Sequence, residues 1–528
     1  MVATLSTGPT WQVSNSDSNI KRTDMKRIYK AVLLAAAFAA ASCSGFLDEK
    51  SNPNYLTPDS FWHSEADINK GLTAAYAALQ PARYWAATVD RFMVTDNIRS
   101  DEVVYRPDVA EWIQIATFTN DLTNYVTDDE WNNLYSGINY CNQCVSNIQG
   151  IEGLDQGLLA RSLAEARFLR AYYYFRLLRN FGERIPLFTK QIEGSEEEYF
   201  PPQSAPGVIK SFIESELSEI QNDLPEEWDQ ANAGRATKYA AQGILAQYYM
   251  FTGQLPKAET ELSKIISSGR FGLLDNYAHL FDGLHKNSKE SIFEIQFCGN
   301  REGGKREHNQ LAEHLSPGDL DGGYEEAYPS PWIFETLKKD LTEDGSYSQR
   351  VYATILFNDP GTRYFLLPEG SEWNDYLPAE SIYWHKFNTW DPSLSSDWYY
   401  SAFNIPVLRY ADILLMYAEC LNNDGKSDEA IEYINMVRAR AQVPPLQVGI
   451  SKEQVLKHLQ DIERPCELAF EGVRWYDLIR WGIVGDALKE HGKLHVENFI
   501  PSKHTLYPIP HKEFLLNPDC EQNPNFAK

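Results

Sequence analysis

Three carboxylates recur at every fourth residue near the carboxyl end of the chain, at Glu463, Glu467 and Glu471. Most glycosidases use a pair of carboxylates, one as an acid and the other as a base or nucleophile. Arg474 and Asp477 follow, and this spacing would put acidic and basic groups on one side of a helix, where they can pair. We therefore interpret this acidic motif as structural and assign it no catalytic residue.

Cysteine and histidine pairs suggest metal or redox chemistry, but no set is complete. Cys141 and Cys144 form a Cys-x-x-Cys pair inside an apolar helical stripe, with no second such pair or His pair at ligand spacing. Structural zinc normally takes four ligands, and this pair supplies only two. We therefore predict that the two cysteines lie on a buried helix face and bind no metal. His308 and His314 are six residues apart and cannot share a helical face.

Other sequence signatures of chemistry are weak or missing. The segment from Asp319 to Gly323 has the acidic start of a calcium loop but lacks its distal glutamate, so we expect a turn. The sequence contains no phosphate loop, no nucleophile elbow and no His-Glu-x-x-His motif. We predict no enzyme activity, no cofactor and no metal.

Aromatic residues in predicted loops are better candidates for binding. Trp and Tyr present flat faces that can pack against the C–H faces of a sugar, whereas Trp131, Trp475 and Trp481 are interpreted as core. Burying about 60 Å² on each of two rings contributes roughly 3 kcal/mol. Association itself costs about 4 kcal/mol or more, so hydrogen bonds must supply the remainder, and we expect affinities between millimolar and micromolar. The candidate ligand-binding residues are Tyr84, Trp85, Trp112, Trp373, Trp390, Trp398, Tyr399 and Tyr400.

Helical periodicity dominates the elements that must position these residues. Two segments, Thr237–Ser267 and Val407–Ala441, are predicted to form helix–turn–helix units, and residues inside them match each other with a displacement of 172 residues. The matched small residues are Ala246, Gly253 and Ala258 in the first segment and Ala418, Gly425 and Ala430 in the second. This pattern is typical of tetratricopeptide-type units, which need neighbours to bury their faces. The predicted partner helices cover residues 64–80, 131–149, 158–181 and 206–224.

Residues 270–405 differ from this helical scaffold. They are rich in Gly, Pro, Asp and aromatic residues and contain only short strand-like runs such as Ser291–Phe297. We interpret them as a loop-rich insertion, and long loops on a rigid scaffold are where binding sites concentrate.

Composition and charge narrow the possible partners. The 528 residues are 43% hydrophobic and 23% charged, which is typical of a globular protein. Removing residues 1–42, which carry five basic and two acidic side chains, leaves a formal charge of −29. Nucleic-acid binding requires clustered Lys and Arg, so this acidic balance argues against it.

The amino-terminal segment resembles an export signal. Basic residues between Met25 and Lys30 precede the apolar run Ala31–Ala41, which is too short to span a bilayer. Small residues then lead directly to Cys43, a pattern typical of a bacterial lipoprotein cleaved before the cysteine and acylated on it; an ordinary secretory signal is the alternative. We interpret residues 1–24 as an over-extended start and 25–42 as the signal peptide.

Five segments, in order, resemble the SusD/RagB family of outer-membrane lipoproteins of the Bacteroidetes. The segments are Cys43 with Phe46–Asp48, Glu165–Phe175 closing at Phe181-Gly182, Arg409–Glu419, Glu467–Leu478, and Leu506–Pro510 with Asn517-Pro518 and Asn523-Pro524. The resemblance implies a mostly helical fold with about four tetratricopeptide-type pairs. It also implies a single domain over 43–528, with helical repeats at about 64–268 and 407–441, the insertion at 270–405 and the family block at 463–528.

The resemblance implies a non-catalytic function as well. Such a protein would be lipid-anchored at Cys43 on the cell surface, capture a glycan and deliver it to a SusC-like TonB-dependent transporter in the outer membrane. Two alternatives remain open at this point: capture of peptides or another non-sugar nutrient, and a glycoside hydrolase on a helical scaffold. A pure tetratricopeptide scaffold would leave the aromatic-rich insertion without a purpose.

Overall fold

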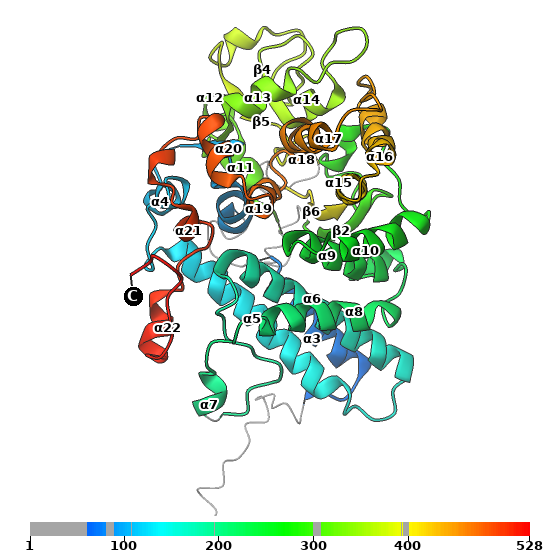
Figure 1. Cartoon of the computed structure of the whole chain (residues 1–528), viewed down its shortest axis with the longest axis vertical. Coiled ribbons are helices and arrows are strands. Elements are labelled where there is room, and N and C mark those ends of the chain that lie inside the picture. Colours follow the sequence, from blue (N-terminus) through cyan, green and yellow to red (C-terminus); the bar gives the residue numbers. More distant parts are fainter. Residues whose placement is uncertain are drawn as a thin grey trace, which may run out of the picture. The chain divides into compact units, whose positions relative to one another are not determined.

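A computed structural model describes residues 61–80, 89–106, 108–194, 196–298, 308–391, 393 and 401–527. The predicted signal peptide and Cys43 lie outside these residues. The part from Trp62 onward forms one compact unit, which is mostly helical, as predicted (Figure 1). Among the described residues, no helix has both the length and the apolar character that a bilayer crossing requires.

Four helix pairs form the scaffold and confirm the predicted fold class. The pairs are α3 (Glu65–Ala77) with α5 (Tyr125–Ile148), α6 (Gln156–Phe181) with α8 (Val208–Glu219), α9 (Lys238–Phe251) with α10 (Leu255–Ser267), and α15 (Tyr410–Asn423) with α16 (Ser427–Arg440). Between pairs, α5 packs on α6, α8 on α9 and α10 on α15, so the pairs stack in series (Figure 1). Each pair thereby buries the apolar faces of its neighbours, as in other helical repeats.

Local sequence signals set the ends of these helices. Ser64 caps α3, where its hydroxyl accepts a hydrogen bond from Asp67 N at 3.3 Å, and Asp155 caps α6 through Leu158 N at 2.9 Å. Helix α6 ends at Gly182, whose φ of +81° favours a residue without a Cβ. Gly253 and Gly425, the matched glycines of the two repeated segments, also have positive φ and turn the chain between paired helices.

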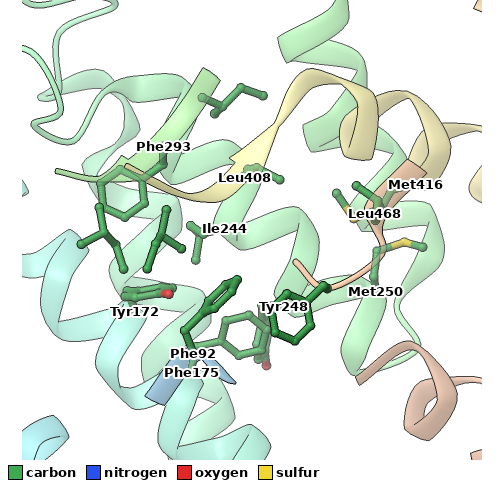
Figure 2. Packing of buried hydrophobic residues seen from close by; sticks show 14 of the residues in the cluster. Phe92, Tyr172, Phe175, Ile244, Tyr248, Met250, Phe293, Leu408, Met416 and Leu468 are labelled. Carbon is green, nitrogen blue, oxygen red and sulfur yellow. The ribbon is translucent and has the colours of Figure 1, made fainter. Parts of the chain in front are cut away.

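One predicted boundary was wrong. The second repeated segment does not begin with a helix, because β6 (Ile405–Arg409) pairs antiparallel with β2 (Ser291–Ile295) before α15 starts. Gly243 of α9 has no Cβ, and a Cβ there would lie 2.1 Å from a methyl group of Leu408. The missing side chain lets β6 approach α9 closely, and Figure 2 shows Leu408 and Phe293 on the side of the strands that faces Ile244 and Tyr172. This long-range packing overrides the local helical pattern.

The insertion contains short elements joined by loops, as the Gly- and Pro-rich composition indicated. Its further elements are η4 (Tyr277–Leu280), α11 (Leu311–Leu315), α12 (Gly318–Asp321), β3 (Ala327–Pro329), α13 (Pro331–Leu337), α14 (Gln349–Thr354), β4 (Ile355–Phe357), η6 (Trp373–Asp375) and β5 (Ile382–Trp384). Strands β4 and β5 pair with each other, and β3 pairs with β1 (Val103–Tyr105), which lies outside the insertion. The pairing of β3 with β1 and that of β2 with β6, which leads directly into α15, connect the insertion to the rest of the fold.

The remaining elements lie before α5, between the scaffold helices and after α16. They are η1 (Val89–Ile98), α4 (Ala110–Ala116), α7 (Glu196–Tyr199), η2 (Ile220–Asn222), η3 (Gln230–Asn232), α17 (Lys452–His458), η8 (Leu459–Glu463), α18 (Arg464–Leu468), α19 (Arg474–Arg480), α20 (Val484–Glu490), η9 (Val496–Asn498), α21 (Pro501–His504) and α22 (His511–Leu516). The chain after α16 packs against several earlier elements, including η1, α9, α13 and α15. The family block is therefore part of the main core.

Candidate functional site

The acidic motif lies in the core and is paired with arginines from other elements. Glu467 accepts hydrogen bonds from Arg409 at 2.5 Å and from Arg440, and Glu463 accepts from Arg350 at 2.7 Å. The Glu467 and Glu463 side chains have no exposed surface. Carboxylates enclosed in this way cannot reach a polysaccharide, so the structural interpretation of the motif is correct.

The partners of this motif differ from those expected. Arg474 pairs with Asp101 at 2.7 Å, and Asp477 pairs with Arg464 at 2.6 Å. The expected single helical side does not form, because α18 ends at Leu468 and Phe470 takes a φ of +61°. Because of this backbone turn, Arg474 and Asp477 contact neighbours other than the three glutamates.

The arginines keep the motif ionised. Burial by itself would raise the pKa of Glu467, but Arg440 and Arg409 outweigh it and hold that pKa at about 2. At Glu463, the charge of Arg350 likewise outweighs the effect of burial and lowers the pKa. A general acid needs a raised pKa, so neither group is suited to protonate a leaving group at neutral pH.

The other sequence pairs are also structural. The Cys141 and Cys144 side chains are fully buried, and burial raises the pKa of the Cys144 thiol to about 12. Such thiols are poor nucleophiles and poor metal ligands. The described part of the chain contains no disulfide. Asp319 lies in the single turn α12, which Gly322 ends in a left-handed conformation, as expected for a turn.

The structure describes three of the eight predicted ligand-binding aromatics. The side chains of Trp112 and Trp373 are 4% and 7% exposed, so they offer a ligand little surface. Trp390 is half-buried, and its ring stacks on His385 with centroids 3.7 Å apart. The other five lie outside the described residues: Tyr84, Trp85, Trp398, Tyr399 and Tyr400. Ligand contact by the eight aromatics stays a prediction.

A hollow of about 510 Å³ with polar and apolar walls lies where α3, the loop before α9 and the end of β2 meet. We call it the α3–β2 hollow. Its walls include exposed Asn69 and Thr73 on α3, Asn232 and Arg235 on the loop, and Gln296 after β2. The hollow therefore combines one wall from the helical repeats with one from the insertion.

Glycine and amide contacts hold the two walls together. A Cβ at Gly234 would lie 2.4 Å from the Gln296 side chain, so only glycine allows this approach, and its φ of +88° also favours glycine. Gln80 donates a hydrogen bond to the carbonyl oxygen of Gln296. The Gln296 amide is in turn paired with Asn287 through bonds of 2.8 and 3.0 Å.

An ion pair forms the floor of the hollow. Arg235 contacts Glu165 of α6 through two hydrogen bonds of 2.7 and 2.8 Å, and Tyr76 donates to the same carboxylate at 3.0 Å. Burial raises the pKa of Glu165, and Arg235 opposes that shift. The charges of Arg235 and Glu165 thus satisfy each other below the hollow, and the exposed side chains on α3, Asn69 and Thr73, are uncharged.

A second, more aromatic cavity of about 220 Å³ lies between α5, the segment around α7, and α22. Its wall includes Tyr199 and Phe200, which are 52% and 40% exposed, and Trp131, which is buried as predicted. Trp131 donates a hydrogen bond to Glu513 at 3.0 Å, and this bond joins α5 to α22. Sequence analysis missed this cavity; the only local indication was an aromatic pair directly after an acidic run.

Comparison with known proteins decides the family. The model described as the SusD family matches residues 289–526, and one described as starch-binding associating with outer membrane matches residues 45–250. The chain belongs to the SusD family. The two matches cover both walls of the α3–β2 hollow.

Relatives cover nearly the whole chain. SusD-like protein P25 of Formosa agariphila is 26% identical over 513 residues, covering 91% of this chain and 95% of its own. The starch-binding protein SusD of Bacteroides thetaiotaomicron is 25% identical and covers 71% of this chain and 74% of its own. Neither of these two relatives is named as an enzyme.

Solved structures share the fold. A SusD superfamily protein from Bacteroides vulgatus is 26% identical with a TM-score of 0.76, covering 88% of this chain and 99% of its own. A structure titled laminarin binding SusD-like protein is also 26% identical, with a TM-score of 0.73, and covers 88% of this chain and 100% of its own. The predicted SusD-type helical fold is thereby confirmed.

Proposed function

We propose that this protein captures a glycan at the bacterial surface and passes it, uncleaved, to a SusC-like TonB-dependent transporter. Membership of the SusD family and the laminarin-binding relative support the glycan as ligand. The family description supports association with the outer membrane. The lipid on Cys43 and the transporter partner belong to this proposal, and they rest on the lipoprotein pattern at residues 25–43 and on the family resemblance.

The α3–β2 hollow carries the proposal as the glycan site. Its volume of about 510 Å³ is in the range of roughly 300–1,000 Å³ that small-molecule sites occupy. Asn69, Thr73 and Asn232 line it with amide and hydroxyl groups, which both donate to and accept from sugar hydroxyls. Tyr84 and Trp85 follow Gln80 of the hollow wall by four and five residues, so they are the predicted aromatics closest in sequence to it.

The charge distribution favours binding over cleavage. The acidic motif is buried and ionised, and no member of it faces the hollow. Burial raises the pKa of Glu102 to about 8, which would suit a general acid, but this side chain is only 1% exposed. An acid without access to substrate cannot protonate a glycosidic oxygen.

Affinity electrophoresis of residues 44–528 in gels that contain laminarin, starch or other polysaccharides tests the proposal. We expect one polysaccharide to retard the protein, without new reducing ends after incubation with it. New reducing ends would establish the glycoside hydrolase alternative and refute the proposal. If no polysaccharide retards the protein and a peptide mixture shifts its melting temperature, peptide capture replaces glycan capture.

A pair of matched variants tests the position of the site. Thr73 and Thr260 are both exposed helix residues whose hydroxyl donates to the carbonyl oxygen four residues earlier, at 2.7 and 3.0 Å. Thr73→Tyr would fill the hollow, whereas Thr260→Tyr on α10 adds the same bulk elsewhere. We expect Thr73→Tyr to abolish retardation and Thr260→Tyr to leave it unchanged.

A variant in the aromatic cavity discriminates between the two cavities. Tyr199→Ala removes an exposed ring from the aromatic cavity and leaves the α3–β2 hollow intact. Loss of retardation in Tyr199→Ala together with normal binding by Thr73→Tyr would move the glycan site to the aromatic cavity.

A further inference from the structure

We propose that His279, Asp282 and His285 form a binding site for a divalent transition-metal ion, with zinc as the best fit. One ligand atom from each residue lies within 4.8 Å of the other two. The sequence spacing is His-x-x-Asp-x-x-His, which was not among the metal-ligand patterns recognised from the sequence. The site is separate from both cavities and from the acidic motif.

The two imidazoles are already side by side. The rings of His279 and His285 stack with centroids 3.8 Å apart and an angle of 10° between their planes. Ligand atoms on one tetrahedral zinc ion lie about 3.3–3.6 Å apart, since each bond is about 2.0–2.2 Å long. Rotation of His285, whose side chain is 43% exposed, can close the remaining gap.

Backbone contacts orient the Asp282 carboxylate toward His285. Asp282 Oδ1 accepts hydrogen bonds from the backbone N–H of Leu284 at 2.8 Å and of His285 at 3.2 Å. The other oxygen, Oδ2, lies 2.7 Å from His285 Nδ1. Hydrogen bonds to a ligating carboxylate fix its direction and are typical of metal sites. The Asp282 side chain thus has one oxygen held by the loop and one in contact with His285, while His279 lies within 4.8 Å.

The ligand types select the metal. Two imidazole nitrogens and one carboxylate oxygen suit zinc and neighbouring transition metals, whereas calcium and magnesium prefer oxygen ligands alone. Three protein ligands leave a position for water or for another side chain. The half-exposed location allows an ion to enter from solvent.

An ion here would fasten the start of the insertion. His279 is in η4, next to buried Tyr277, whose hydroxyl donates to Glu467 O in the core. On the other side, Lys286 donates to Phe297 O at 2.7 Å, and Phe297 lines the α3–β2 hollow. The metal would therefore link the core to the segment that leads to β2 and to one wall of the hollow.

Isothermal titration of ZnCl₂ into metal-free residues 44–528, with melting temperatures measured in parallel, tests the site. We expect one zinc ion per chain and a higher melting temperature, and no response to CaCl₂ at the same concentration. His279→Gln and His285→Gln should each weaken zinc binding at least tenfold. The assay uses no glycan, so its result does not depend on the proposed function.

Two further variants make the result decisive. His511→Gln removes an exposed histidine from α22, outside the cluster, and should bind zinc like the unaltered protein. Asp282→Asn keeps an oxygen for the Leu284 N–H but loses the negative charge, so it should fold normally and bind zinc more weakly. Equal zinc affinity in His279→Gln, His285→Gln and His511→Gln would overturn the proposal, as would a response to calcium alone.

Discussion

Replacing Glu467 with Gln tests whether the acidic motif stabilises the fold. The substitution preserves the size of the side chain and removes one charge from a site where Arg409, Arg440 and Arg350 converge. All three guanidinium groups and the carboxylate are almost completely buried. Solvent therefore cannot replace the lost charge, and the arginines would remain buried with less compensation.

The pKa of Glu467 gives the contribution of its carboxylate to folding stability. The pKa of Glu467 is about 2 in the folded protein, against 4.5 ordinarily. Each pKa unit corresponds to about 1.4 kcal/mol, so the ionised carboxylate contributes about 3 kcal/mol of folding stability at pH 7. Removing one partner of a buried ion pair typically costs about 3–5 kcal/mol, and the value of about 3 kcal/mol agrees with this range. Because the folded pKa lies below the unfolded one, this contribution is complete above about pH 4.5 and is lost as the pH falls toward 2.

Urea unfolding of both proteins at pH 7 and pH 3, followed by tryptophan fluorescence, measures the difference. We expect Glu467→Gln to lower the free energy of unfolding by about 3–5 kcal/mol at pH 7 and by less than half of that at pH 3. Glu335→Gln is the control, since its pair with Lys338 is exposed and should contribute less than about 1 kcal/mol. A loss below about 1 kcal/mol at pH 7, or an equal loss at both pH values, would refute the reasoning.

Three further predictions concern other parts of the molecule. Gly182→Ala should lower the free energy of unfolding by about 1–2 kcal/mol in urea, because φ is +81° and the added Cβ would lie 2.9 Å from Leu506; an unchanged midpoint would contradict this. Trp398→Ala should weaken polysaccharide retardation without changing the melting temperature, and unaltered affinity would remove this residue from the site. Iodoacetamide at pH 8 should leave Cys141 and Cys144 unmodified in the native protein and label them in urea, because burial raises the pKa of both thiols. Labelling of the native protein, measured by mass spectrometry, would contradict this prediction.

The helix ends show what local sequence can predict. Ser64 and Gly182 act through the backbone of their own helices, so their roles follow from residue type and position. The matched glycines Gly253 and Gly425 likewise mark turns between paired helices. These effects depend on atoms within a few residues, and they therefore leave a signal in the local sequence.

The candidate site shows where prediction fell short. The insertion does supply one wall of the α3–β2 hollow, through Gln296, but the opposite wall comes from α3. Gly234 gave no indication in the sequence that it allows the approach of a side chain from the end of β2. His279, Asp282 and His285 follow each other at intervals of three residues in the sequence. Only the fold shows that the loop turns back and stacks the two imidazole rings.

The sequence by itself determined the helical repeats, the export signal interpretation and the family resemblance, because these depend on periodicity, small residues and short motifs read along the chain. The tertiary structure decided which charges pair and where the cavities lie. Arg350 and Glu463 are 113 residues apart in sequence but 2.7 Å apart in space. No local pattern encodes such a distance, because it results from packing whole elements against one another. The same packing places Val407 to Arg409 in a strand, although the predicted helix–turn–helix segment began at Val407.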